Sequence, residues 1–275
     1  MFYIFGSPRS GTTFLKESLC LNPEIIILNE TDFLPGVAHV LNSIADPAQG
    51  KKIIYKIISN TTFSSSICKY LSGDKLFEII NTSEYNLSSI IMSLYQEILS
   101  LTDAKIIGDK TPNYIVLADF LESLGLFDAN LKFIHIVRDL RDVLLSVKKM
   151  TWSPKNSAEF LLFSETWAHS NLTMSELGKK HPKKYFFLRY EDFVAYPQKY
   201  FQEIFKFLDV NYDRPILNWS DVKKDVHDPS IHPNIGLPPQ KDRAYAWKNN
   251  FNNQEIIDLT FPATEALQFY GYNSR

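Results

Sequence analysis

The stretch GSPRSGTTF at positions 6–14 follows a short apolar run and contains residue types that bind phosphate groups. A glycine-containing turn between a strand and a helix directs several backbone N–H groups to one point, where the helix dipole also favours negative charge. Arg9 adds a planar guanidinium, and Thr12 and Thr13 add hydroxyl donors. The stretch differs from the ATP-binding loop G-x-x-x-x-G-K-[ST], because Thr12 stands where that loop has its lysine. Since that lysine reaches the β- and γ-phosphates, its absence predicts a ligand with a single phosphate at this point.

A second stretch, FIHIVRDLRDVLLS at positions 133–146, has an arginine at the end of an apolar strand and a serine in the helix that follows. Ser146 lies about two helical turns after Arg138, so both side chains face the same side. Together they fit a second phosphate, separate from the first. The alternative is that Arg138 pairs with Asp139 or Asp142 at the start of the helix.

In this order, the two stretches resemble the binding elements of sulfotransferases that use 3′-phosphoadenosine 5′-phosphosulfate (PAPS). SPRSGTTFL resembles their 5′-phosphosulfate loop, and FIHIVRDLRDVLLS resembles their 3′-phosphate element. The R-S-G-T-T form is similar to that of protein-tyrosine and other Golgi-type sulfotransferases and of bacterial relatives. The resemblance implies PAPS as donor, adenosine 3′,5′-bisphosphate (PAP) as product, and no metal. The cofactor-binding residues that it implies in these two stretches are Arg9, Ser10, Gly11, Thr12, Thr13, Arg138 and Ser146.

Two residues at predicted strand ends are candidates for catalysis. Sulfuryl transfer to an alcohol needs a base for the hydroxyl proton and a cationic donor for the growing charge. Glu30 in ILNET is similar to the catalytic glutamate of tyrosine sulfotransferases, although Asp32 replaces the arginine that follows there, so their recognition of acidic peptides is not carried over. Lys110 in GDKTP matches a lysine that stabilises the sulfuryl group. A glutamate that caps the next helix and a solvated lysine are the alternatives.

Two further segments resemble cofactor-binding parts of the family. In FFLRYEDF, the resemblance places Tyr190 near the nucleotide. PQKDRAYAWKNNF resembles the R-K-G-x-x-G-D-W-K-x-x-F segment of cytosolic sulfotransferases, with Lys241 and Trp247 in matching positions. Gln240 replaces its arginine and both glycines are lost, so Arg243 would have to supply the charge. Trp247 is predicted either to stack on adenine or to belong to the core.

The elements that must position these residues alternate between apolar runs and helical patterns. Continuous apolar runs predict strands buried on both faces of a parallel sheet. These runs are 1–5, 24–28, 104–108, 131–137 and 184–188. We therefore expect an α/β fold of a single domain over residues 1–275, with a P-loop-like central parallel sheet flanked by helices. Helices are expected from Thr12, from Pro112 with Thr111 as cap, after Arg138 and over about 156–178.

Two long segments fall outside this alternation. We expect residues 33–103 to form a mostly helical insertion beside the sheet. We expect residues 211–250 to form a functional loop or lid, because this segment is rich in proline and lacks periodicity. Ser230, His227 and His232 in that loop are weaker candidates for substrate contacts.

Composition limits the classes of partner. The 29 basic and 31 acidic residues give a net charge of −2, which offers no whole-protein reason to bind nucleic acid or an anionic membrane. No apolar run approaches the roughly 18 residues that span a bilayer, and the chain begins with a strand rather than a signal peptide. We expect a cytoplasmic protein without a membrane span; a trimmed luminal domain is the alternative. Neither the cysteines nor the histidines have metal-ligand spacing.

The sequence thus predicts a PAPS-dependent sulfotransferase that transfers a sulfuryl group to a hydroxyl of a small molecule or peptide by in-line displacement. One alternative is a P-loop kinase of nucleosides or small molecules, for which Asp109 is the single strand-end candidate to bind magnesium. A nucleotide-binding protein without catalysis is the other. No motif distinguishes a sugar, a peptide tyrosine, a phenol or a lipid alcohol as acceptor.

Overall fold

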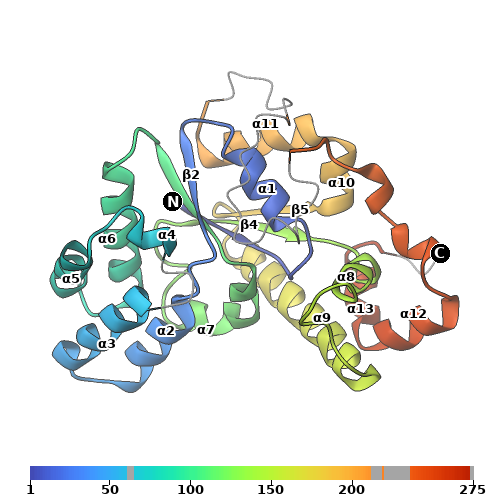
Figure 1. Cartoon of the computed structure of the whole chain (residues 1–275), viewed down its shortest axis with the longest axis horizontal. Helices are drawn as coiled ribbons and strands as arrows, with labels where there is room; N and C mark the ends of the chain where they lie inside the picture. Colours follow the sequence, from blue (N-terminus) through green and yellow to red (C-terminus); the bar gives the residue numbers. More distant parts are fainter. Residues whose placement is uncertain (61–64, 212–218, 220–235, 273–275) are drawn as a thin grey trace.

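The fold is built on one sheet of five parallel strands in the order β2-β3-β1-β4-β5 (Figure 1). The computed structural model describes residues 1–60, 65–211, 219 and 236–272. The strands are β1 Phe2–Phe5, β2 Ile25–Asn29, β3 Ile106–Lys110, β4 Lys132–Val137 and β5 Tyr185–Arg189. Each corresponds to one of the predicted apolar runs, with bounds shifted by at most two residues. The predicted α/β fold with a central parallel sheet is confirmed.

Both faces of the sheet are buried, because alternate residues of a strand point to opposite faces. In β1, Phe2 and Ile4 pack into one core cluster, whereas Tyr3 and Phe5 pack into another. Helices α1, α10 and α11 contribute to the first cluster and lie above the sheet in Figure 1. Their bounds are α1 Thr12–Leu19, α10 Tyr190–Ala195 and α11 Pro197–Leu208.

The opposite face is covered by the predicted helical insertion together with the 3-10 helix η1, α7 and part of α9. The insertion consists of α2 Leu34–Ser43, α3 Pro47–Asn60, α4 Ser65–Cys68, α5 Gly73–Thr82 and α6 Leu87–Ser100. Side-chain N-caps fix two of its helix starts: Ser72 accepts from the backbone N–H of Lys75, and Asn86 accepts from that of Ser89.

The helix expected from Pro112 begins instead as the 3-10 helix η1 Pro112–Leu117, which continues into α7 Ala118–Ser123. Thr111 precedes η1, but its hydroxyl does not cap that helix. It donates to Asp109 at 2.7 Å. The predicted start at Pro112 is therefore confirmed, whereas the predicted cap is wrong, because a buried carboxylate takes the Thr111 hydroxyl.

The C-terminal elements form a third core cluster with α8 Leu140–Val147 and α9 Ser157–Lys180. They are η5 Ala246–Asn249, α12 Asn253–Thr260, η6 Phe261–Ala263 and α13 Thr264–Phe269. The 3-10 helix η4 Lys241–Arg243 precedes them and has no buried residue. Much of the predicted lid lies outside the described residues, and so do its candidates Ser230, His227 and His232.

Candidate active site

The predicted site residues lie at the carboxyl ends of neighbouring strands. Strand β1 pairs with β3 on one side and with β4 on the other. The loop that contains Arg9 follows β1, Lys110 ends β3 and Arg138 follows β4. Ligands of open α/β sheets bind at this edge, so the sheet order brings three separate sequence motifs to one place.

The loop after β1 has a conformation that depends on glycine. Gly11 is the N-cap of α1 with φ of 92°, and Arg9 also has a positive φ, 68°. A Cβ at Gly11 would lie 2.6 Å from Cδ2 of Tyr190, so the tyrosine ring lies directly against the loop. The hydroxyl of Ser10 is buried and has no hydrogen-bond partner among the described residues. A buried polar group in that state is a good candidate for a ligand contact.

A contact between side chains joins the two predicted phosphate elements. Nε of Arg9 donates to Oγ of Ser146 at 3.0 Å. Arg138 donates to the backbone carbonyls of Arg9 at 3.1 Å and of Arg243 at 2.8 Å, and its guanidinium lies 4.4 Å from the centre of the Tyr190 ring. Among the described residues, Arg138 makes no ion pair with Asp139 or Asp142: Asp139 pairs with Arg141, and Asp142 accepts from two backbone N–H groups. Arg138 ties the first loop to the C-terminal segment.

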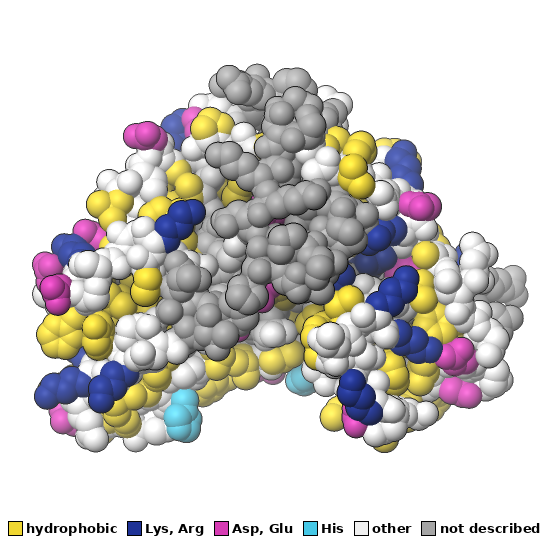
Figure 2. All heavy atoms as spheres, in the orientation of Figure 1, with side chains coloured by type: hydrophobic (Ala, Val, Ile, Leu, Met, Phe, Trp, Pro, Cys, Tyr) yellow, Lys and Arg dark blue, Asp and Glu magenta, His cyan; other side chains and the backbone are white. Residues whose placement is uncertain are grey.

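The three arginines of this cluster raise the local positive potential. Burial lowers the pKa of Arg9, and the charges of Arg138 and Arg243 lower it further. Within the described part of the chain, Nε of Arg138 is buried without a hydrogen-bond partner. Figure 2 shows Lys and Arg side chains gathered on this face over the region of α8 and α10. Lys241 and Arg243 are exposed. An anionic ligand would offset the repulsion among these cations.

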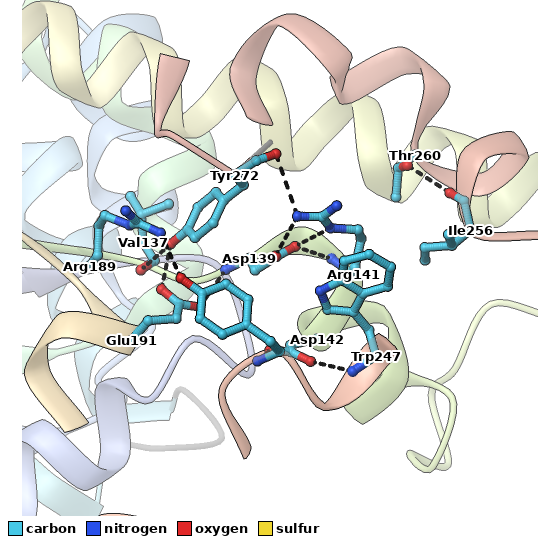
Figure 3. A network of polar contacts seen from close by, with 11 residues as sticks. Val137, Asp139, Arg141, Asp142, Arg189, Glu191, Trp247, Ile256, Thr260 and Tyr272 are labelled. Atoms are coloured by element: carbon cyan, nitrogen blue, oxygen red, sulfur yellow. Dashed lines mark hydrogen bonds and ion pairs between the residues drawn. The ribbon is translucent and has the colours of Figure 1, made fainter. Parts of the chain in front are cut away.

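The segment that contains Arg243 is held against α8 by a polar network (Figure 3). The carboxylate of Asp142 accepts from the backbone N–H groups of Tyr245 at 2.6 Å and Trp247 at 2.9 Å. The Arg141 guanidinium lies 3.9 Å from the centre of the Trp247 ring and makes a bidentate contact with Asp139. Trp247 is 6% exposed and belongs to the third core cluster. Stacking of Trp247 on adenine stays a prediction.

The catalytic candidates form an ion pair. Nζ of Lys110 lies 2.6 Å from Oε1 of Glu30; the Lys110 side chain is 4% exposed, and that of Glu30 is 36% exposed. The register of the sheet explains the contact, because Asn29 and Lys110 are the last paired residues of β2 and β3. Asp32 lies next to this pair, and its pKa is raised by partial burial and by the charge of Glu30.

The first loop is also anchored by α9, through a residue that contacts β4. Asn171 donates from Nδ2 to Oγ of Ser7 at 2.9 Å and to the carbonyl of Trp167 at 2.7 Å, so its Oδ1 faces Nε2 of His135 at 2.9 Å. Nε2 of His135 therefore carries the proton, and Nδ1 accepts from the Tyr185 hydroxyl at 2.7 Å. Burial lowers the pKa of His135 to about 4, which keeps it neutral.

Sequence reasoning missed the residues that hold these segments in place, notably Asn171, Asp142 and Arg141. Asp142 and Arg141 lie inside the quoted second stretch, on the helix turn after Arg138, so their nearness to the site could have been inferred. No sequence signal marks Asn171, because its side-chain partners His135 and Ser7 are 36 and 164 residues away. Among the described residues, no group of His, Cys, Asp and Glu is arranged to hold a metal ion, and no helix is long and apolar enough to cross a membrane.

Comparison with curated relatives gives matches to tyrosine sulfotransferases. The chain is 23% identical to "Protein-tyrosine sulfotransferase" of Drosophila melanogaster over 248 residues, covering 88% of this chain and 42% of that protein. It is 24% identical to "Protein-tyrosine sulfotransferase A" of Caenorhabditis elegans over 282 residues, covering 98% of this chain and 67% of the relative. The chain thus spans less than half of the first relative.

Two solved structures share the fold. The sulfotransferase domain from the Synechococcus PCC 7002 olefin synthase superposes with a TM-score of 0.66 at 22% identity, covering 99% of this chain and 94% of that one. The sulfotransferase domain from the curacin biosynthetic pathway gives a TM-score of 0.63 at 20% identity, with 97% and 96% covered. Residues 2–214 match the model of the sulfotransferase family, a region that contains β1 to β5, both predicted phosphate elements and the Glu30–Lys110 pair. The chain belongs to the sulfotransferase family.

Proposed function

We propose that this protein transfers the sulfuryl group of PAPS to an acceptor hydroxyl and releases PAP. The observation that carries the proposal is the contact of Arg9 Nε with Ser146 Oγ at 3.0 Å. It joins the two predicted phosphate elements through residues that are 137 positions apart in the sequence, and the ribose of PAPS carries phosphate groups at its 3′ and 5′ positions. Membership of the sulfotransferase family supports the same reaction class.

In this proposal the donor lies across the loop after β1 and the segment from Arg138 to Ser146, which includes most of α8. The backbone N–H groups at the start of α1, with the hydroxyls of Ser10, Thr12 and Thr13, bind the 5′-phosphosulfate. Arg138 and Ser146 bind the 3′-phosphate. The buried hydroxyl of Ser10 supports the assignment, because it lacks a partner within the described residues.

The remaining cofactor candidates surround this position. Arg9 lies between the two elements through its contact with Ser146. Tyr190 packs against both Gly11 and Arg138, so it links the loop to the second element. The proposed set of cofactor-binding residues also includes Lys241, Arg243 and Trp247.

The chemistry is an in-line displacement at sulfur. The acceptor oxygen forms a bond to sulfur while its proton passes to the Glu30 carboxylate. The bond between sulfur and the bridging oxygen of the 5′-phosphate breaks, and its electron pair stays on PAP. Lys110, held 2.6 Å from Glu30, stabilises the charge that grows on the departing side. The partly exposed Glu30 is accessible to an acceptor, whereas the buried Lys110 is held in one place.

The kinase alternative has less support in the structure. Its magnesium ligand would be Asp109, whose carboxylate is fully buried and accepts hydrogen bonds from the hydroxyls of Thr31, Tyr95 and Thr111.

Relatives that are named protein-tyrosine sulfotransferases make a peptide hydroxyl one candidate acceptor, beside small molecules. The cytoplasmic location and the single-domain extent stay predictions.

Thermal unfolding with two ligands tests the donor. A ligand at a hundred times its dissociation constant adds about 2.7 kcal/mol to the free energy of unfolding. We expect PAP to raise the unfolding temperature in the presence of a chelator, and ATP with magnesium to have little effect. Stabilisation by ATP with magnesium alone would contradict the proposal and favour a kinase. A screen of sugars, phenols, tyrosine peptides and lipid alcohols with sulfur-labelled PAPS would then identify the acceptor.

A further inference from the structure

Strand β3 carries a buried carboxylate, that of Asp109, immediately before Lys110. Oδ2 of Asp109 accepts from the hydroxyl of Thr31 at 2.6 Å and from that of Tyr95 at 2.5 Å, and Oδ1 accepts from the hydroxyl of Thr111 at 2.7 Å. Asp109 and Thr31 are both 0% exposed and Thr111 is 1% exposed. A buried carboxylate needs such donors, because nothing else replaces its lost hydration.

The same residues cross-link the two chain segments that carry the catalytic candidates. Thr31 follows Glu30, and Thr111 follows Lys110. The paired residues of β2 and β3 end at Asn29 and Lys110, so the ladder does not hold the chain beyond them. There the backbone N–H of Thr31 donates to Oγ1 of Thr111 at 2.9 Å, and both hydroxyls donate to Asp109. We call Thr31, Asp109 and Thr111 the clamp.

The direction of the hydrogen bonds makes Asp109 an acceptor throughout. The single hydroxyl proton of Thr31 goes to Asp109, so the Tyr114 hydroxyl, 2.9 Å away, donates to Thr31. Tyr114 in turn accepts from the backbone N–H of Leu34 at 3.3 Å. These donors converge on one carboxylate that acts only as an acceptor. The clamp therefore has a fixed orientation, which an isolated hydroxyl contact would lack.

The backbone turns directly after Thr31. Asp32 has φ of 50°, a left-handed conformation that aspartate adopts more readily than most residues other than glycine. Glu30 lies between the last paired residue of β2 and the clamp, with a side chain that is 36% exposed and otherwise able to turn into solvent. Fixing the backbone on both sides limits where its carboxylate can go.

We propose that Thr31, Asp109 and Thr111 are positioning residues, which keep the Glu30 carboxylate aligned with Lys110 and the acceptor. This inference rests on the proposed function, because it assigns the clamp a role through Glu30. The clamp residues are buried, so they act through Glu30 and not directly on the donor or acceptor. Its loss lowers turnover through misplacement of the base and leaves the phosphate-binding loop unchanged.

A pair of matched variants tests the clamp. Thr31→Val keeps the shape but removes the hydroxyl, whereas Thr31→Ser keeps the hydroxyl. We expect kcat with the best acceptor of the screen to fall on the order of ten- to a hundredfold in Thr31→Val and to stay near wild type in Thr31→Ser. The dissociation constant of PAP should change less than twofold in both. Equal kcat for the two variants would overturn the proposal, and so would a parallel loss of PAP binding in Thr31→Val.

A double-mutant cycle with Glu30→Gln separates positioning from general damage. If the clamp acts through Glu30, Thr31→Val should have little further effect on kcat once Glu30 is replaced, so the two effects are not additive. If the effects of the two substitutions on kcat multiply, the clamp does not act through Glu30 and the proposal is overturned. Turnover that is unaffected by Glu30→Gln would instead contradict the proposed base, and the clamp's role would fall with it. A low kcat in Glu30→Gln together with a normal kcat in Thr31→Val would contradict the role of the clamp but not that of the base.

Discussion

Nζ of Lys110 and Oε1 of Glu30 are 2.6 Å apart, although the two residues are 80 positions apart in the sequence. Parallel pairing of β2 with β3 brings them together, since Asn29 and Lys110 are register partners. The contact places a cation beside a partly exposed carboxylate at the ligand-binding edge of the sheet. This pair is the part of the site on which the proposed mechanism depends most.

Replacing Glu30 by glutamine should slow turnover and spare donor binding. Gln keeps the size and can still hydrogen bond to Lys110, but it cannot take a proton from the acceptor. We expect kcat to fall by roughly a hundred- to ten-thousandfold. Steady-state kinetics with labelled PAPS and titration with PAP measure the two quantities. Joint loss of turnover and PAP binding would make Glu30 a structural residue.

Removing the Arg138 guanidinium should weaken PAP binding. Hydrogen bonds to a charged group contribute roughly 1.5–3 kcal/mol, so Arg138→Ala should raise the PAP dissociation constant by about ten- to a hundredfold. Arg9→Ala should have an effect of similar size, with additional loss in the double variant. Calorimetric titration with and without a chelator measures both affinities. An unchanged PAP affinity in Arg138→Ala would contradict its assignment to the 3′-phosphate.

Two glycines provide a matched test of the loop after β1. Gly11 and Gly125 have φ of 92° and 77°, so alanine at either should cost about 1–2 kcal/mol of folding free energy. A Cβ at Gly125 would meet only Oδ2 of Asp128 at 3.9 Å, whereas one at Gly11 would lie 2.6 Å from the Tyr190 ring. We expect Gly11→Ala to be the less stable variant in urea unfolding and the only one of the two that weakens PAP binding. Equal free energies of unfolding for the two variants would argue against a tight contact between the loop after β1 and the Tyr190 ring.

Two buried groups should make opposite contributions to the dependence of stability on pH. Burial raises the pKa of Asp109 from 3.8 to about 6, and burial lowers the pKa of His135 from 6.5 to about 4. Between pH 4 and pH 6 the folded state binds more protons at Asp109 than the unfolded chain, so this contribution to stability falls as pH rises. At His135 the unfolded chain binds more protons, so that contribution rises with pH. Each amounts to roughly 3 kcal/mol.

Variants at the two positions should separate these contributions. From pH 4 to pH 7, the free energy of unfolding of Asp109→Asn relative to wild type should shift in favour of the variant. For His135→Gln, the free energy of unfolding relative to wild type should fall over the same pH range. Urea unfolding at four pH values measures both differences. Shifts of the same sign in the two variants would show that one of these pKa directions is wrong.

The sequence by itself determined the fold class and the likeness to sulfotransferases. Continuous apolar runs predicted the strands, because a strand buried on both faces needs apolar side chains at nearly every position. The loop at 6–13 and the Arg138–Ser146 element were recognisable because anion binding by a helix start and by an arginine depends on residues that are close in sequence.

Tertiary structure alone decided which of these residues meet. The contacts of Arg9 with Ser146 and of Glu30 with Lys110 depend on which strands are neighbours in the sheet, which composition and periodicity do not encode. The clamp around Asp109 could not be predicted either. Its hydroxyls come from separate segments, and Thr111 had the local signature of a helix cap. Burial of one carboxylate outweighed that local preference, because leaving Asp109 without donors costs more free energy than losing a cap.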